Sequence, residues 1–221
     1  MKNLIILLIL VIGSRLYGQT DSIEKAIIYK KFLSKEITQG AFSEIGNDWI
    51  KAVKKVNKYP DLPLDQKGQV HYSFLNDYKG FSKEKLFDRT LEWLSINYGI
   101  FPAYLYSNIE EGKIILNNSF NITDTYSCNY TCIITIKSEK LLMEIFKIGY
   151  QVYHGAHYSG DTYVSESTSN FDINQVFPII LKKPSEWELN LNLLKTTNEN
   201  IDSQIVSLDD YILNYDFNYN F

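Results

Sequence analysis

The chain has 221 residues, and 26 acidic against 22 basic side chains give it a net charge of −4. A chain of this length can bury one sizeable core, and its acidic balance argues against nucleic-acid binding, which depends on Lys and Arg at phosphates. Arg89 is the only arginine after residue 18, which excludes sites where several arginines hold phosphates or carboxylates.

The first residues, MKNLIILLILVIGSRLYGQT, have the layout of a secretory signal. A positive charge at Lys2 precedes an apolar run over 4–12, and smaller, more polar residues follow up to Gly18. Because so short a run cannot cross a hydrocarbon layer of about 30 Å, the alternative of an uncleaved anchor is disfavoured. We expect 1–18 to be a signal peptide cleaved after Gly18, and the mature protein to be periplasmic or extracellular without a transmembrane anchor.

Residues 19–66 are predicted to form a helical extension and a linker. Apolar side chains recur there at spacings of three and four, which is helical periodicity. The clearest set is Ile45, Trp49, Ala52, Val53 and Val56. The stretch YPDLPLDQKGQ follows and concentrates prolines, a glycine and polar residues, as connections do. It should separate the extension from a main domain over 67–215, which a tail over 216–221 follows.

The main domain is expected to begin with a strand over 70–75 and a helix over 82–98. Ser82 is a suitable N-cap, and Phe81 and Leu86 stand at the spacing of a hydrophobic staple. Strand-like segments joined by short turns follow at 103–108, 113–122, 126–137 and 140–153. Strands joined this tightly should be antiparallel neighbours.

The end of the main domain is expected to be a helix after a less regular stretch. Residues 155–170 are rich in Ser, Thr, Tyr and Gly and show no periodicity. A helical face then appears at Ile201, Ile205, Leu208 and Ile212. The order strand, helix, four strands, helix predicts an α+β fold: an antiparallel β-sheet with two helices packed on one face, preceded by the helical extension.

Three segments carry a resemblance to a known family: HYSFLNDYKGFSKEKLFDRTLEWLSINYG, EEGKIILN and IVSLDDYIL. Together they resemble a family of exported bacterial domains of unknown function, found mainly in Bacteroidetes. The resemblance covers residues 69–213 and implies a fold similar to that of the TATA-binding protein (TBP-like). It implies no activity and no catalytic residues. DNA binding does not follow from it, because a fold does not fix a function and this chain is acidic.

Cys128 and Cys132, the only two cysteines, lie four residues apart in TYSCNYTCIITIK. A disulfide is the first hypothesis for an exported protein. The alternation of side chains, however, predicts a strand with one buried face, along which four residues span about 13 Å. A disulfide needs Cα atoms within about 7 Å, so we expect two buried free thiols.

The stretch HGAHYSGD holds three potential metal ligands: His154, His157 and Asp161. Zinc takes such side chains in a tetrahedral set, and a solvated loop is the alternative because no fourth ligand is evident. The sequence has no nucleophile elbow, zinc-protease helix or phosphate-binding glycine loop. We therefore predict no catalytic residue and no cofactor.

The candidate ligand-binding residues are Tyr150, Tyr153, Tyr158, Tyr163 and Arg89. The tyrosines gather in one region, and aromatic side chains contribute much to binding surfaces. Arg89 also has a structural explanation, an ion pair with Glu92 and a cation–π contact with Trp93.

These patterns favour an exported, non-catalytic binding module. It would present the open face of its sheet, or its Tyr-rich region, to an unknown peptide, glycan or protein of the cell envelope. One alternative is a cell-envelope hydrolase or metal-dependent enzyme that uses His154, His157 and Asp161. A purely structural envelope component is another.

Overall fold

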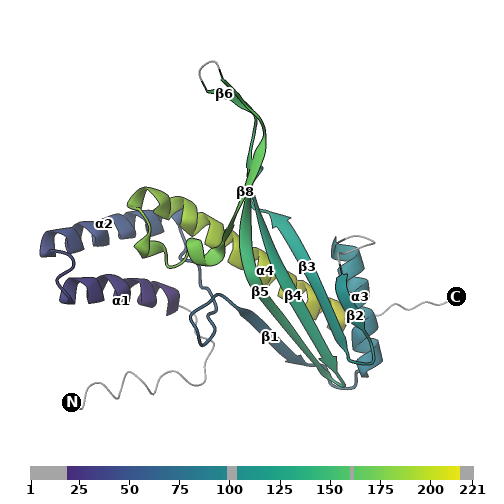
Figure 1. Cartoon of the computed structure of the whole chain (residues 1–221). Helices are drawn as coiled ribbons and strands as arrows, with labels where there is room; N and C mark the ends of the chain where they lie inside the picture. Colours follow the sequence, from purple (N-terminus) through teal and green to yellow (C-terminus); the bar gives the residue numbers. More distant parts are fainter. Residues whose placement is uncertain (1–18, 99–103, 160–161, 215–221) are drawn as a thin grey trace, which may run out of the picture.

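The structure, a computed structural model, describes residues 19–98, 104–159 and 162–214 (Figure 1). Its helices are α1 (Gln19–Leu33), α2 (Gln39–Val56), α3 (Lys83–Tyr98) and α4 (Trp187–Asn214). Its strands are β1 (Tyr72–Asp77), β2 (Tyr104–Asn108), β3 (Lys113–Asn121), β4 (Tyr126–Lys137), β5 (Lys140–His154), β6 (His157–Ser159), β7 (Thr162–Val164) and β8 (Ser167–Asp172). The predicted signal peptide and the tail over 216–221 lie outside the described residues.

The main sheet is antiparallel and has the order β1-β5-β4-β3-β2, with β8 also pairing with β5. β1 pairs with the first half of β5, and β8 pairs with its second half. Helices α3 and α4 lie on one face of this sheet, and no described helix covers the other face (Figure 1). The predicted α+β fold, with its strand, helix, four strands and helix, is confirmed.

The stretch over 155–170 is more regular than predicted. β6 and β7 form a short antiparallel hairpin, and β8 returns along β5. Together they make a ribbon that projects from one end of the sheet (Figure 1). Every side chain of β8 except that of Phe171 is exposed. Backbone pairing with β5, rather than burial of side chains, therefore defines this strand.

The buried face of β5 changes parity within the strand. Leu141, Met143 and Ile145 point to the helices, and after an irregularity near Lys147 the even-numbered residues Ile148 and Tyr150 do so. Lys147 has a positive φ of 52°, and the register with β4 shifts opposite it. Such a bulge adds one residue to a strand and exchanges the faces of all residues beyond it.

Tyrosines and polar residues of α4 join the helix to the sheet. The Tyr72 hydroxyl donates to Asn198 Oδ1 at 3.0 Å, and the Tyr150 hydroxyl lies 3.0 Å from Thr197 Oγ1. Asn198 and Thr197 are buried, so the tyrosines satisfy polar groups that would otherwise be costly in a core. α4 begins at Trp187, well before the apolar periodicity at Ile201, and its buried face includes these polar positions.

The second N-terminal helix, α2, shares this core. Trp49 of α2 packs edge-on against Trp187 at the start of α4, with ring centroids 5.3 Å apart. Buried residues of α2, α3, α4 and the sheet form one cluster. The predicted helical extension is therefore packed against the N-terminal part of α4.

Candidate binding surfaces

The four candidate tyrosines do not lie on one surface. Tyr150 is 1 % exposed and faces α4, whereas Tyr153 and Tyr163 are 44 % and 59 % exposed. Tyr158 belongs to β6, and its side chain is outside the described set. A hydrogen bond to Glu166 raises the pKa of Tyr153. Burial removes Tyr150 from the predicted surface, and the bulge in β5 is the reason.

The candidate metal ligands lie on or near the ribbon. His154 ends β5, and its Nε2 lies 2.9 Å from Ser169 Oγ of β8. His157 begins β6, and Asp161 is outside the described residues. Within 19–98, 104–159 and 162–214, no group of three His, Cys, Asp or Glu side chains is placed to hold a metal ion. A site completed by Asp161 stays a prediction.

Arg89 joins α3 to the end of α4. Its Nη1 donates to the backbone carbonyl of Ile212, and its guanidinium lies 5.1 Å from the ring centroid of Phe81. A cation at a helix C-terminus interacts favourably with the helix dipole. The predicted partner Trp93 instead packs edge-on against Tyr98, so the cation–π partner is Phe81.

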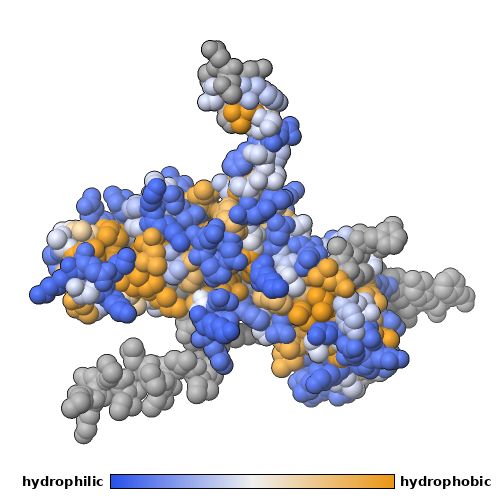
Figure 2. All heavy atoms as spheres, in the orientation of Figure 1, coloured by the Kyte–Doolittle hydropathy of each residue, from blue (hydrophilic) through white to orange (hydrophobic). Residues whose placement is uncertain are grey.

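The uncovered face of the sheet carries apolar side chains on each of the five main strands. Two sets of cross-strand neighbours supply them: Leu75 with Leu142, and Ile133 with Ile115 and Tyr106. Between β5 and β4 the two sets are diagonal neighbours, because the direct partner of Leu142 is Thr135 and that of Ile133 is Glu144. We call Leu75, Leu142, Ile133, Ile115 and Tyr106 the apolar row. Leu75 is 64 % exposed and Tyr106 36 %. Figure 2 shows hydrophobic surface on the half of the molecule far from α1 and α2, with hydrophilic surface around the strand ends.

Toward the ribbon the same face becomes polar. Asn117, Ser119 and Asn121 of β3 are exposed, and Ser127 and Asn129 of β4 lie beside them in register. One face of the sheet therefore combines an apolar end with a polar end.

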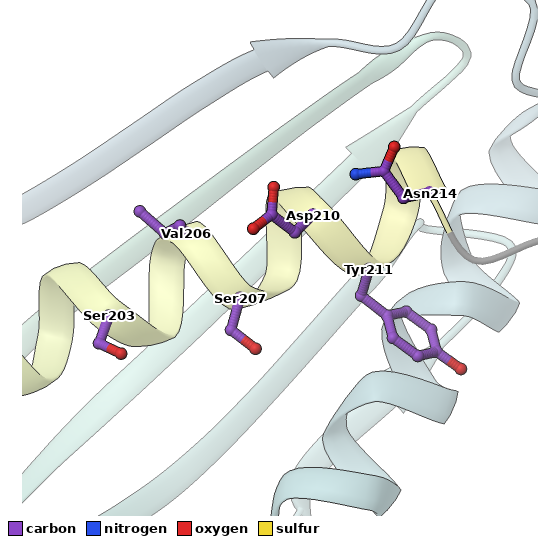
Figure 3. A pocket seen from close by; sticks show the side chains of 6 residues that line it. All are labelled: Ser203, Val206, Ser207, Asp210, Tyr211 and Asn214. Atoms are coloured by element: carbon purple, nitrogen blue, oxygen red, sulfur yellow. The ribbon is translucent and has the colours of Figure 1, made fainter.

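Two hollows adjoin α4. The first, of about 440 Å³, is an open depression along the helix (Figure 3). Val206 and Asp210 project outward there, while Tyr211 points toward α3. Ser207, also in its lining, accepts a hydrogen bond from Trp93 Nε1 at 3.0 Å.

The second hollow is a groove of about 730 Å³ between α4, β1 and the connection at 61–64. We call it the β1 groove. Its α4 side consists of Asn198, Asp202, Ile205, Val206 and Asp209. The lining of neither hollow includes a histidine or cysteine, so neither brings together the usual members of a nucleophilic or zinc-dependent site.

No protein-family model and no curated protein matches this chain. Among solved structures it is similar to a TBP-like protein from Parabacteroides distasonis, with a TM-score of 0.51 and 20 % identity over 70 % of this chain and 99 % of that chain. The fold is TBP-like. A DUF4468 family protein from Bacteroides ovatus matches with a TM-score of 0.48 and 16 % identity, over 71 % of this chain and 92 % of that chain.

The similarity to the TBP-like protein covers 70 % of this chain, and it confirms the fold implied by the sequence resemblance. At this identity it shows the fold alone. Among the described helices, none combines the length and the apolar character needed to cross a membrane.

Proposed function

We propose that this protein is an exported, non-catalytic interaction module that binds a protein partner on the uncovered face of its sheet. The observation that supports this most is the apolar row, which places an apolar side chain on each of the five main strands, on a face that no described helix covers. Solvent-facing sides of antiparallel sheets usually carry polar residues. Apolar side chains gathered on such a side are typical of protein–protein contacts.

The distribution of polarity on this face fits a protein interface. Interfaces combine an apolar, aromatic centre with a polar rim. The apolar row ends in Tyr106 on β2, and exposed Asn117 and Ser119 lie farther along β3. A flat surface of this kind suits another folded protein better than a small molecule, which needs a concave site.

The ribbon is a second candidate contact element. It projects beyond the sheet (Figure 1), and Tyr163 on β7 is 59 % exposed. An aromatic side chain on a projecting hairpin offers large contact area at small entropic cost. The ribbon would then extend the interface beyond the sheet.

Site-specific crosslinking in the exporting cell tests the proposal. A photoreactive phenylalanine analogue would replace Tyr106 in the apolar row, Asn121 at the polar end, or Tyr163 on the ribbon. We expect a discrete crosslinked protein from position 106 and none from 121. Crosslinks from position 163 alone would show that the partner binds the ribbon instead of the apolar row. No crosslink from either position 106 or position 163 would contradict the proposal.

Export is tested in the same cells. The N-terminal residue of the protein recovered from the periplasm or medium should be Gln19, and mass spectrometry identifies it. A chain recovered from the membrane with residues 1–18 intact would contradict this part of the proposal.

A further inference from the structure

β1 is an edge strand, and no described strand pairs with its outer side. The hairpin between β4 and β5 pairs Lys137 with Lys140 across a two-residue turn. Residues flanking such a turn exchange both backbone hydrogen bonds. Even-numbered residues at the start of β5 therefore bond to β4, and odd-numbered residues bond to β1.

The same alternation fixes which groups of β1 face outward. In the β1–β5 register, the odd-numbered β5 residues stand opposite Tyr72, Phe74 and Asn76. The backbone groups of Ser73, Leu75 and Asp77 consequently point away from the sheet. Two hydrogen bonds next to the strand agree: Tyr78 N–H donates toward β5, to Glu139 at 2.7 Å, and His71 N–H donates outward, to Pro63 at 2.9 Å.

The connection that precedes β1 pairs with only one end of this edge. Leu64 forms a bridge with Val70, and Pro63 accepts the bond from His71. At the other end of the strand, Asp77 N–H is satisfied by Asn76 Oδ1 at 2.9 Å. Between these points, Ser73 and Leu75 present N–H and C=O groups without a partner among the described residues. An open row of this kind is a template for an added strand.

The β1 groove lies directly beside this open edge. The α4 residues in its lining are spaced so that Asn198, Asp202 and Asp209 lie on one face of the helix. Leu62 and Leu64 close one end, and Ile205 and Val206 add apolar surface. An added strand would thus have backbone partners on one side and side-chain contacts on the other.

The groove is acidic. Its ionisable lining residues, apart from Tyr72, are Asp61, Asp202 and Asp209, and the lining contains no lysine or arginine. Asp202 accepts from Asn198 Nδ2 at 2.9 Å, and Asp209 accepts from Asn76 Nδ2 at 2.6 Å and from the Tyr78 hydroxyl at 2.7 Å. These neutral donors orient the two carboxylates without cancelling their charge.

Burial and neighbouring charges act on Asp202 in opposite directions. Desolvation raises its pKa, and the Asp61 and Glu199 carboxylates add to the rise, while Lys58 opposes it. Lys58 itself lies 3.7 Å from Glu199. A cation entering the groove would meet the carboxylates of Asp202 and Asp209, whose hydrogen-bond donors named above are neutral side chains.

We propose that the β1 groove binds an extended, basic segment of another polypeptide, which adds a strand to β1 and places Lys or Arg side chains beside Asp202 and Asp209. Strand addition to an open edge is an established mode of peptide recognition. Asp202 and Asp209 are separated by about 10 Å along the helix, at about 1.5 Å per residue. Basic residues two or four positions apart, about 7 or 13 Å in a strand, match that separation within the reach of their side chains.

A second copy of this chain fits the groove less well. Edge-to-edge pairing of two β1 strands would bring together two copies of the same aspartates, and like charges across an interface are unfavourable. This site adjoins the apolar row at Leu75, which lines the groove as well. The two proposals are tested by different residues, Tyr106 for the row and Asp202 and Asp209 for the groove, so each can fail without the other.

The test uses a labelled peptide of sequence SKVKVKS, whose lysines share one side of a strand, and the full chain. Fluorescence anisotropy should show binding that weakens with added salt, and the matched peptide SEVEVES should not bind. Equal binding of both peptides, or no binding of SKVKVKS, would overturn the proposal.

Charge variants locate the site. Asp202→Asn and Asp209→Asn keep an oxygen that accepts the existing hydrogen bonds, and each should weaken SKVKVKS binding about fivefold, as expected for a partly exposed charge pair. Asp210→Asn makes the same charge change on α4 but lines the open depression instead, and it should change binding less than about twofold. Equal effects of all three would overturn the site.

A backbone variant tests strand addition. Ser73→Pro removes an outward N–H and leaves the bonds to β5 intact, because proline is tolerated at such edge positions. It should reduce binding at least about tenfold, whereas Ser73→Thr should not. Unchanged binding by a folded Ser73→Pro protein would overturn the added-strand geometry. If this variant melts early, a peptide with N-methylated alternate residues replaces it, and its binding at wild-type strength would have the same consequence.

Discussion

The carboxylate of Glu24 accepts a hydrogen bond from the backbone N–H of Ile179 at 2.6 Å. Its second oxygen accepts one from Ile180 at 2.9 Å. Glu24 is a fully buried residue of α1, and these donors begin the 3-10 helix η2 (Ile179–Leu181). A carboxylate that satisfies the first N–H groups of a helix caps it and interacts favourably with its dipole. This contact ties the N-terminal extension to the segment that leads into α4.

Replacing Glu24 should destabilise the whole protein. Glu24→Ala leaves two buried donors unsatisfied and should cost about 3 kcal/mol in the free energy of unfolding, while Glu24→Gln retains one acceptor and should cost about 1–2 kcal/mol. Urea denaturation measures both. Glu44→Gln, an exposed position on α2, is the matched control and should change stability by less than about 0.5 kcal/mol. Losses that small at Glu24 would contradict its role as a cap.

The main elements were predictable because their signals are local. Ser82 caps α3 as expected, accepting from Lys85 N–H at 3.2 Å, and the alternation around Cys128 and Cys132 placed β4 correctly. Short turns between consecutive strands then fix antiparallel neighbours. Neither inference needs knowledge of distant residues.

What could not be predicted depends on contacts between distant residues. The first half of α4 escaped detection because its buried stripe includes Thr197 and Asn198, whose partners are tyrosines of the sheet. Tyr150 was expected on the surface because a bulge near Lys147 reverses the parity of β5. The β1 groove combines a strand with aspartates more than a hundred residues later, and neither segment alone signals a site.

The turn at Gly112 requires glycine for two reasons. Its φ is 63°, and a Cβ added there would lie 2.0 Å from the carbonyl oxygen of Ile136. The Gly112 carbonyl also accepts from Ile136 N–H at 2.6 Å, so the two backbones cannot separate without losing this bond.

Gly112→Ala should therefore be among the most damaging single substitutions. Gly80 has a similar φ of 81° but nothing within 4 Å of its Cβ position, so Gly80→Ala isolates the conformational cost of about 1–2 kcal/mol. Gly112→Ala should exceed about 4 kcal/mol, in the range of severe steric defects. Thermal and urea unfolding measure both. Equal losses would show that the close approach to Ile136 is relieved at little cost.

Cys128 and Cys132 are free and buried, as predicted from the strand pattern. Desolvation raises the pKa of each thiol to about 12 from its ordinary 9. Because the thiolate is the reactive form, native protein at pH 8 should resist iodoacetamide, and denatured protein should take up two labels. Mass spectrometry counts the labels. Labelling of the native protein, or a disulfide between the two residues, would contradict the strand assignment.

The same shifts predict a pH dependence of stability. The folded state retains thiol protons that the unfolded chain releases above pH 9, so the thiols' contribution is fully present below pH 9 and is lost as pH rises toward 12. Desolvation also raises the pKa of Tyr98 to about 12, and its contribution is lost above pH 10 in the same direction. A double Cys128→Ala, Cys132→Ala variant should lose stability less steeply between pH 9 and 10, where the tyrosine contributes little.

The ribbon provides the discriminating test between a binding module and a metal-dependent enzyme. His154 Nε2 is engaged with Ser169, and both residues are exposed. Structural and catalytic zinc sites usually have at least three protein ligands held by a supporting shell of hydrogen bonds. We therefore expect purified protein to contain less than about 0.1 zinc per chain by elemental analysis, and His157→Ala to leave its melting temperature unchanged with or without added zinc. The opposite result would be one zinc per chain that is lost in both His157→Ala and Asp161→Ala but retained in Asp172→Ala on β8. That result would establish the metal site and support the enzyme hypothesis.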